Sequence, residues 1–168
     1  LGYGLVSAAC DYDLPFLAKH CDVFYIGGTK VGAMMGEAVV FSGMKAPKYF
    51  FTNIKRHGAL LAKGRMLGIQ FDTLFTDNLY FKISRHAIAM ATRIRSIFQK
   101  HGIAIAYDSP TNQQFVVLSP SLYDALSKKV AFEIWERKSD TEIICRFVTS
   151  WATKEKELDE LEHILQTL

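Results

Sequence analysis

A lysine that follows a predicted strand is the first residue of this sequence that could do covalent chemistry. Lys30 ends the segment Gly27-Gly28-Thr29-Lys30, directly after a predicted buried strand at residues 22–26. An amine that forms an imine must be neutral and held in a fixed position. The glycines would let the backbone approach a bulky ring, and the hydroxyl and amide of Thr29 could hold a phosphate oxygen. A solvated turn lysine shows the same local pattern, so both interpretations stay open at this point.

Arg146 is a second candidate because it lies inside an apolar strand, between Cys145 and Phe147. An arginine among hydrophobic residues needs a partner or a position that faces a cleft. Its planar guanidinium suits a carboxylate, which can accept two hydrogen bonds from it. The alternative is an arginine at a strand edge that pairs with a nearby acid, such as Glu133 or Glu142.

Basic residues beside glycines form a third group of candidates. They are Lys55, Arg56 and His57, before Gly58, and Lys63 and Arg65, on either side of Gly64. Such residues at a helix junction could hold a phosphate, although a solvated helix face has the same composition. The histidines form no HxH or HExxH pattern, so no metal site is expected.

Capping signals and periodicity predict the elements around Lys30. Asp13 and Pro15 mark the start of a short helix that reaches about residue 20. Apolar runs predict strands at residues 22–26 and 37–41. The region that follows, 46–76, looks mostly helical, and we expect interruptions at Gly58, Gly64 and Gly68.

A long amphipathic helix at about 77–101 leads into a region of different character. Its apolar stripe includes Leu79, Ile83 and Ile94, and Gly102 supplies the stop. Beyond it the sequence predicts strands at 103–106, 115–118, 130–136 and 142–148, a short helix from Ser119-Pro120, and a last helix at 153–168. Residues 1–76 therefore look like the end of an α/β unit, and residues 77–168 like a small α+β domain.

Composition indicates a soluble globular protein. The hydrophobic fraction is 49% and the charged fraction 22%, and no apolar run approaches the length that spans a bilayer. The net charge of +3 is too small to argue for nucleic acid. The cysteines, Cys10, Cys21 and Cys145, are widely spaced and odd in number, which favours reduced thiols in the cytoplasm.

Together, these candidates resemble a known enzyme family. The segment at residues 22–41, with Gly27-Gly28-Thr29-Lys30 at its centre, resembles the cofactor-lysine segment of the threonine aldolase and β-eliminating lyase family. The segment that begins at Arg146 resembles that family's C-terminal arginine strand, and Lys63-Gly64-Arg65 falls where the family has a glycine-rich basic turn.

The resemblance implies an α/β fold of the aspartate-aminotransferase type and pyridoxal 5'-phosphate (PLP) as cofactor. Residues 1–76 would be the last part of the PLP-binding large domain, and 77–168 the small C-terminal domain. Lys30 would form the imine link to PLP and then act as a base or proton shuttle, with Thr29 and Gly28 lining the cofactor pocket.

The resemblance also implies roles for the other basic residues. Arg146 would hold the α-carboxylate of an amino-acid substrate. Arg65, together with Lys63, would approach a PLP phosphate, that of a neighbouring subunit, because family members look like homodimers or homotetramers with shared active sites. The implied reaction is retro-aldol cleavage of a β-hydroxy amino acid to glycine and an aldehyde.

Other functions stay open on the residues alone. An aminotransferase, or a lyase that eliminates from cysteine or an aromatic amino acid, would share the lysine and the arginine. A non-catalytic binding or oligomerisation domain is a second class of alternative. The sequence opens on Leu1 rather than Met, and the family's ring-stacking residue, pyridine-nitrogen aspartate and phosphate loop should precede it. We therefore expect a C-terminal half that is a poor catalyst alone, with an unpaired sheet edge near Leu5 and Val6.

Overall fold

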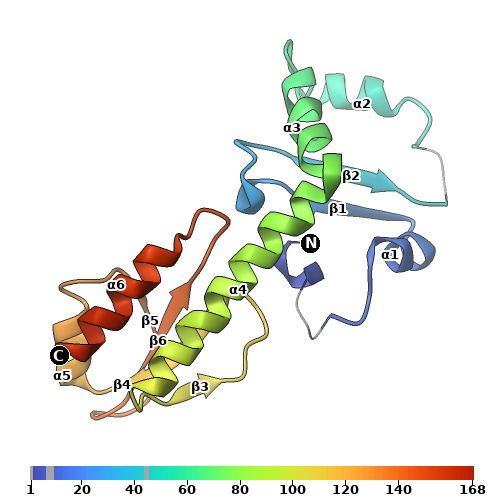
Figure 1. The fold of residues 1–168 in the computed structure, drawn as a ribbon. Helices are drawn as coiled ribbons and strands as arrows, with labels where there is room; N and C mark the ends of the chain where they lie inside the picture. Colours follow the sequence, from blue (N-terminus) through green and yellow to red (C-terminus); the bar gives the residue numbers. More distant parts are fainter. Residues whose placement is uncertain (1, 7–9, 44–45) are drawn as a thin grey trace.

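The computed structural model describes residues 2–6, 10–43 and 46–168. Leu1, on which the sequence opens, lies outside this set. Figure 1 shows two groups of elements, each with its own sheet, along one long helix, α4 (Leu79–Lys100). Among the described residues, no helix is both long and apolar enough to cross a membrane.

The first group of elements surrounds a two-stranded antiparallel sheet of β1 (Val23–Gly27) and β2 (Glu37–Phe41), in which Tyr25 pairs with Val39. The other elements of this group are η1 (Tyr3–Val6), α1 (Leu14–His20), η2 (Thr29–Val31), α2 (Phe50–Arg56), α3 (Arg65–Phe75) and η3 (Thr76–Asn78). Helix α1 begins as predicted, because the side chain of Asp13 accepts a hydrogen bond of 2.8 Å from the backbone N–H of Phe16.

The second group contains a four-stranded antiparallel sheet in the order β3-β4-β6-β5. Its strands are β3 (Ile105–Tyr107), β4 (Gln113–Leu118), β5 (Glu133–Arg137) and β6 (Ile143–Val148), and its helices are α5 (Pro120–Leu126) and α6 (Glu155–Gln166). Helices α4 and α6 lie side by side. Ser119 caps α5 as predicted, with its hydroxyl accepting from the N–H of Leu122 at 3.2 Å.

Two clusters of buried residues hold these groups together. The larger packs α4, α5 and α6 against the four-stranded sheet, with Phe98, Val116 and Phe147 among its members. The smaller joins the two-stranded sheet to the start of α4, where Tyr80 and Ala87 are fully buried. Since α4 contributes to both clusters, the boundary between residues 76 and 77 stays a prediction.

The predicted helices and strands are confirmed within a few residues at their ends, with two exceptions. Gly68 does not interrupt a helix, because α3 runs continuously through it. The expected sheet edge near Leu5 and Val6 is also wrong, since η1 forms a 3-10 turn there. That turn packs against α4, so Tyr3 is buried between the two groups of elements.

Candidate active site

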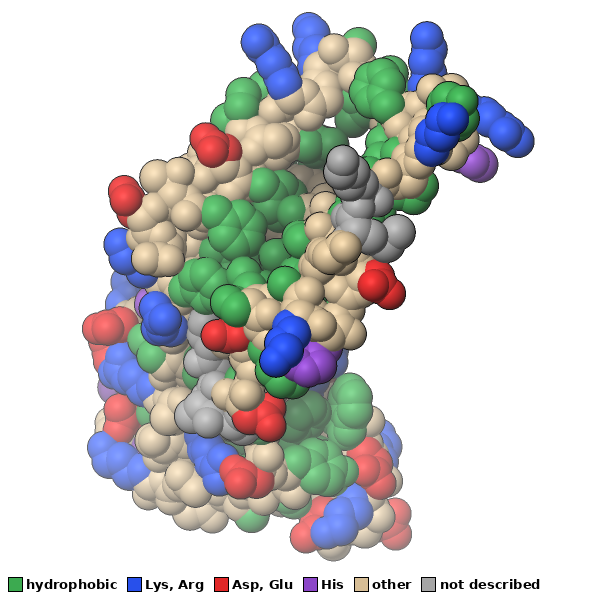
Figure 2. All heavy atoms as spheres, turned by 90° about the vertical axis from the view of Figure 1, so that its right-hand side faces the viewer, with side chains coloured by type: hydrophobic (Ala, Val, Ile, Leu, Met, Phe, Trp, Pro, Cys, Tyr) green, Lys and Arg blue, Asp and Glu red, His purple; other side chains and the backbone are tan. Residues whose placement is uncertain are grey.

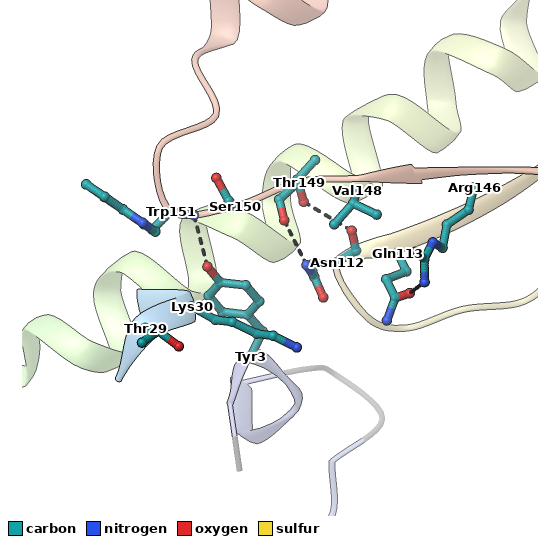
Figure 3. A pocket seen from close by; sticks show the side chains of 10 residues that line it. All are labelled: Tyr3, Thr29, Lys30, Asn112, Gln113, Arg146, Val148, Thr149, Ser150 and Trp151. Carbon is teal, nitrogen blue, oxygen red and sulfur yellow. Dashed lines mark hydrogen bonds between the residues drawn. The ribbon is translucent and has the colours of Figure 1, made fainter. Parts of the chain in front are cut away.

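A cavity of about 340 Å³ brings Lys30 and Arg146 together. It lies between η2 and the end of β6, and its lining consists of Tyr3, Thr29, Lys30, Asn112, Gln113, Arg146, Val148, Thr149, Ser150 and Trp151. In Figure 3 Thr29 and Lys30 lie on one side of the cavity, and Gln113 and Arg146 on the other. The volume is at the lower end of the range of about 300–1,000 Å³ that is usual for ligand pockets.

Packing at Gly28 fixes the backbone that carries Lys30. A Cβ at Gly28 would lie 2.8 Å from both the Cβ of Ala33 and the ring of Phe71, so only glycine fits there. The carbonyl oxygen of Gly28 accepts hydrogen bonds of 3.0 Å from the N–H groups of Val31 and Ala33, which close the turn around Lys30. Gly28 thus fixes the shape of the turn but does not line the cavity. The side chain of Lys30 lines the cavity and is exposed.

Arg146 occupies the middle of β6, opposite Phe115 of β4 and Glu133 of β5. Its Nη1 donates to Oε1 of Gln113 at 3.0 Å, and its Nη2 donates to the carboxylate of Glu133. The guanidinium carbon lies 5.3 Å from the ring centroid of Trp135, within range of a cation–π contact. Of the two acids considered from the sequence, Glu133 is therefore the partner of Arg146.

Glu142, the other acid considered, pairs with Lys138 at 2.9 Å and not with Arg146. The side chain of Arg146 is 27% exposed and that of Glu133 is 67% exposed. Arg146 thus lines the cavity and at the same time makes an ion pair at the surface. Both interpretations of Arg146 from the sequence therefore hold together: it faces a cleft, and it pairs with a local acid.

Three residues that the sequence did not single out fix the end of β6. The hydroxyl of Tyr3 accepts from the N–H of Trp151 at 3.1 Å, and Nδ2 of Asn112 donates to the carbonyl of Thr149 at 2.7 Å. The hydroxyl of Thr149 donates to the carbonyl of Ala87 in α4 at 2.6 Å. Thr149 could have been predicted, because a threonine at the end of an apolar strand is a recognisable pattern. Tyr3 could not, because its partner Trp151 lies 148 positions away in the sequence.

Two buried tyrosines serve this site as neutral hydrogen-bonding groups. Burial raises the pKa of the Tyr3 phenol, and the hydrogen bond from Trp151 acts in the opposite direction. Burial, and then the nearby Tyr3, raise the pKa of Tyr80 to about 12. The hydroxyl of Tyr80 donates to the carbonyl of Gly27 at 3.2 Å, which connects α4 to the strand that precedes Lys30.

Lys63 and Arg65 lie apart from the cavity. Both are exposed, Arg65 at the start of α3 and Lys63 in the turn before it, and neither is in the cavity lining. Figure 2 shows lysine and arginine side chains gathered at the end of the molecule formed by α2 and α3. Contact with a cofactor in a neighbouring subunit therefore stays a prediction for these residues.

The residues of the cavity suit PLP and its amino-acid substrate in part. Lys30 offers an amine for the cofactor's aldehyde, Thr29 a hydroxyl, and Arg146 a cation for a carboxylate, all around one cavity. The Nε–H of Arg146 is buried without an acceptor among the described residues, so the guanidinium has a further donor to offer to an acidic group. Among the residues that the structure describes, no Asp or Glu in the cavity lining could face the pyridine nitrogen. No group of metal-binding side chains occurs in the described ranges.

Comparison with known proteins finds threonine aldolases among the relatives of this chain. No protein-family model matches the sequence. The low specificity L-threonine aldolase of a Pseudomonas species is 29% identical over 142 residues, which is 83% of this chain and 40% of that protein. The enzyme of the same name from Pseudomonas aeruginosa is 27% identical over 142 residues, with the same coverage.

A solved structure shows the same relationship in the fold. The threonine aldolase of Leishmania major superposes with a TM-score of 0.88 and is 37% identical, over 97% of this chain and 48% of that one. The chain thus spans less than half the length of these relatives. In sequence and in fold the chain is similar to threonine aldolases, and it has the α/β fold of the aspartate-aminotransferase type that the sequence predicted.

Proposed function

We propose that this chain supplies the lysine and the carboxylate-binding arginine of a PLP-dependent lyase of the threonine aldolase type. The observation that carries the proposal is that Lys30 and Arg146, 116 positions apart, line one cavity. The similarity to threonine aldolases over most of the chain supports it. The reaction would be cleavage of a β-hydroxy amino acid to glycine and an aldehyde.

Lys30 would hold the cofactor covalently and then move a proton at its free amine. Thr29 lies beside it in the lining and would contact the cofactor, while Gly28 would keep the turn in place beneath them. When bound, PLP supplies an electron sink for the bond that breaks. Arg65 and Lys63 would approach the phosphate of a cofactor in a partner subunit of a homo-oligomer.

Arg146 would orient the substrate. The bond to be broken must stand perpendicular to the cofactor ring, so rotation about the substrate's Cα has to be fixed. A guanidinium that holds the α-carboxylate fixes this rotation, and Gln113 keeps that guanidinium in place from the side of β4. The cavity therefore separates a proton-transfer side, at Lys30, from a carboxylate-binding side, at Arg146.

The neighbouring PLP reactions differ in their products, so product analysis tests the proposal. The protein, at the full length in which it occurs, is incubated with PLP and L-threonine, and residues 1–168 are assayed in parallel. We expect glycine and acetaldehyde in equal amounts from the full-length protein and loss of both in Lys30→Ala. Residues 1–168 should be a poor catalyst, because the described part of the chain places no acid in the cavity lining.

Two outcomes would refute the proposed reaction. Ammonia and a keto acid would indicate elimination, and an amino group transferred to an added keto acid would indicate an aminotransferase. If the Lys30→Ala variant still forms glycine, the reaction does not require this lysine. We further propose a soluble cytoplasmic protein, in line with its thiols and with the absence of a membrane-spanning helix among the described residues.

A further inference from the structure

The carboxylate that Arg146 holds in this structure belongs to the protein itself. Glu133 stands directly opposite Arg146 across β5 and β6, and its Oε2 accepts from Nη2. Gln113 and Trp135 hold the rest of the guanidinium, through a hydrogen bond to Nη1 and a contact with the ring face. The group proposed to bind the substrate's carboxylate is thus already occupied.

The contact with Glu133 uses only part of what the guanidinium offers. Nε lies on the same edge of the guanidinium as Nη2, and it is buried without an acceptor among the described residues. A carboxylate that approached this edge with both oxygens could accept from Nε and Nη2 together, which is the stronger, bidentate arrangement. Glu133 accepts from Nη2 alone, so a bidentate carboxylate would bind more strongly.

The two partners also differ in how firmly they are held. The Glu133 side chain is 67% exposed on β5, which is an edge strand of the sheet, and it can turn into solvent. The Arg146 side chain is 27% exposed and keeps Gln113 and Trp135 as neighbours when Glu133 leaves. Ion pairs with one well-exposed partner contribute little stability, so little is lost when this one opens.

We propose that Glu133 is an internal competitor for the substrate's α-carboxylate. It occupies Nη2 of Arg146 when no substrate is bound and gives this nitrogen up to a carboxylate that can accept from Nη2 and Nε together. Glu133 thereby weakens the binding of every carboxylate at Arg146, because each one must first displace it from Nη2. The inference rests on the proposed function, because it assigns the incoming carboxylate to the amino-acid substrate.

A titration that needs no cofactor tests this inference. The chain is labelled with ¹⁵N, and the Nε–H signal of Arg146 and the indole N–H signal of Trp135 are followed as L-threonine is added. Signals are assigned with Arg146→Lys and Trp135→Phe. Glu133→Gln keeps the shape of the side chain and removes its charge. Glu142→Gln is the matched control, because it opens the pair with Lys138 on the same hairpin without touching Arg146.

We expect Glu133→Gln to bind L-threonine about two- to fivefold more tightly than the original chain, as the strength of an exposed ion pair implies. Glu142→Gln should bind like the original chain, and Arg146→Lys should lose the response. Equal or weaker binding in Glu133→Gln, the same gain in Glu142→Gln, or no binding in Glu133→Gln would overturn the inference.

The titration and the test of the proposed function fail independently. If Lys30 takes up no PLP while Glu133→Gln still tightens carboxylate binding, the lyase proposal fails and the competition at Arg146 stands. If Lys30 carries PLP and Glu133→Gln changes nothing, the lyase proposal stands and Glu133 is only a surface partner of Arg146.

Discussion

At the scale of single residues, Tyr80 joins the long helix to the strand that carries Lys30. Its ring is fully buried and stacks on Phe75 with a centroid distance of 5.3 Å, and its hydroxyl reaches the carbonyl of Gly27. A phenol with a pKa of about 12 stays protonated in the folded protein, whereas an unfolded tyrosine ionises near pH 10.

This difference predicts a loss of stability at alkaline pH. Between about pH 10 and pH 12 the unfolded chain releases the Tyr80 proton and the folded chain keeps it, so the free energy of unfolding falls as the pH rises. Tyr80→Phe should lower it by about 1 kcal/mol at pH 8, through the lost hydrogen bond. Between pH 8 and pH 11 the free energy of unfolding should fall less in Tyr80→Phe than in the original chain, by about 1 kcal/mol, because the variant lacks this phenol. Urea unfolding at both pH values measures this, and parallel declines would contradict it.

The residues that do the proposed chemistry could be predicted from the sequence, but their neighbours mostly could not. Lys30 and Arg146 stand out because a lysine after a glycine turn and an arginine within an apolar strand are unusual. Gln113 and Tyr3 reach the site through strand register and a long-range contact, 33 and 148 positions from their partners. Such contacts form only in the folded chain, so no local sequence pattern predicts them.

At the scale of elements, two glycines that look alike in the sequence behave differently. Gly28 has no room for a side chain, because Ala33 and Phe71 lie where its Cβ would be. Gly68 lies inside α3 with nothing within 4 Å of a Cβ. The sequence predicted a helix break at Gly68, but α3 packs Phe71 and Leu74 into the smaller buried cluster, and this packing outweighs the low helix propensity of one glycine.

The two glycines make a matched pair of variants. Gly28→Ala should destabilise the chain by about 1–3 kcal/mol, because the added methyl group must displace a packed neighbour. Gly68→Ala should stabilise it by about 0.5–1 kcal/mol, since alanine favours the helix. Thermal unfolding of both variants measures the difference. A Gly28→Ala variant as stable as the original chain would mean that the turn around Lys30 is not held by this packing.

The helices and strands themselves followed well from capping signals and apolar periodicity. Ser119 and Asp13 each cap the predicted helix through the predicted side-chain oxygen. The order of the four-stranded sheet, with β6 between β4 and β5, did not follow, because pairing depends on contacts between distant segments.

At the scale of the whole molecule, the structure exposes a large apolar surface on its first group of elements. Figure 2 shows hydrophobic side chains across this side of the protein. Tyr25 and Val39 on the two-stranded sheet are 57% and 55% exposed, and Tyr49 and Phe51 at the start of α2 are 66% and 65% exposed. Patches of this kind commonly mark contact surfaces between proteins, which supports the proposed homo-oligomer.

Substitution within this surface should therefore weaken self-association. We expect Phe51→Glu to raise the dissociation constant of the oligomer at least about fivefold, as for a residue that contributes over 1 kcal/mol to an interface. Thr52→Glu, which adds the same charge at the next exposed position of α2, should change it less. Sedimentation velocity over a range of protein concentrations measures both. A chain that is monomeric throughout, or equal effects of the two variants, would contradict this placement of the interface.

Borohydride reduction of the PLP-treated protein, followed by peptide mass mapping, tests whether Lys30 carries PLP. The full-length protein and residues 1–168 are treated in parallel, with Lys30→Arg as the control. We expect a phosphopyridoxyl group on Lys30 of the full-length protein, well above the labelling of exposed lysines such as Lys19 and Lys48. Lys30 unlabelled, or labelled no more than those lysines, would contradict it and leave a binding or oligomerisation domain as the better account.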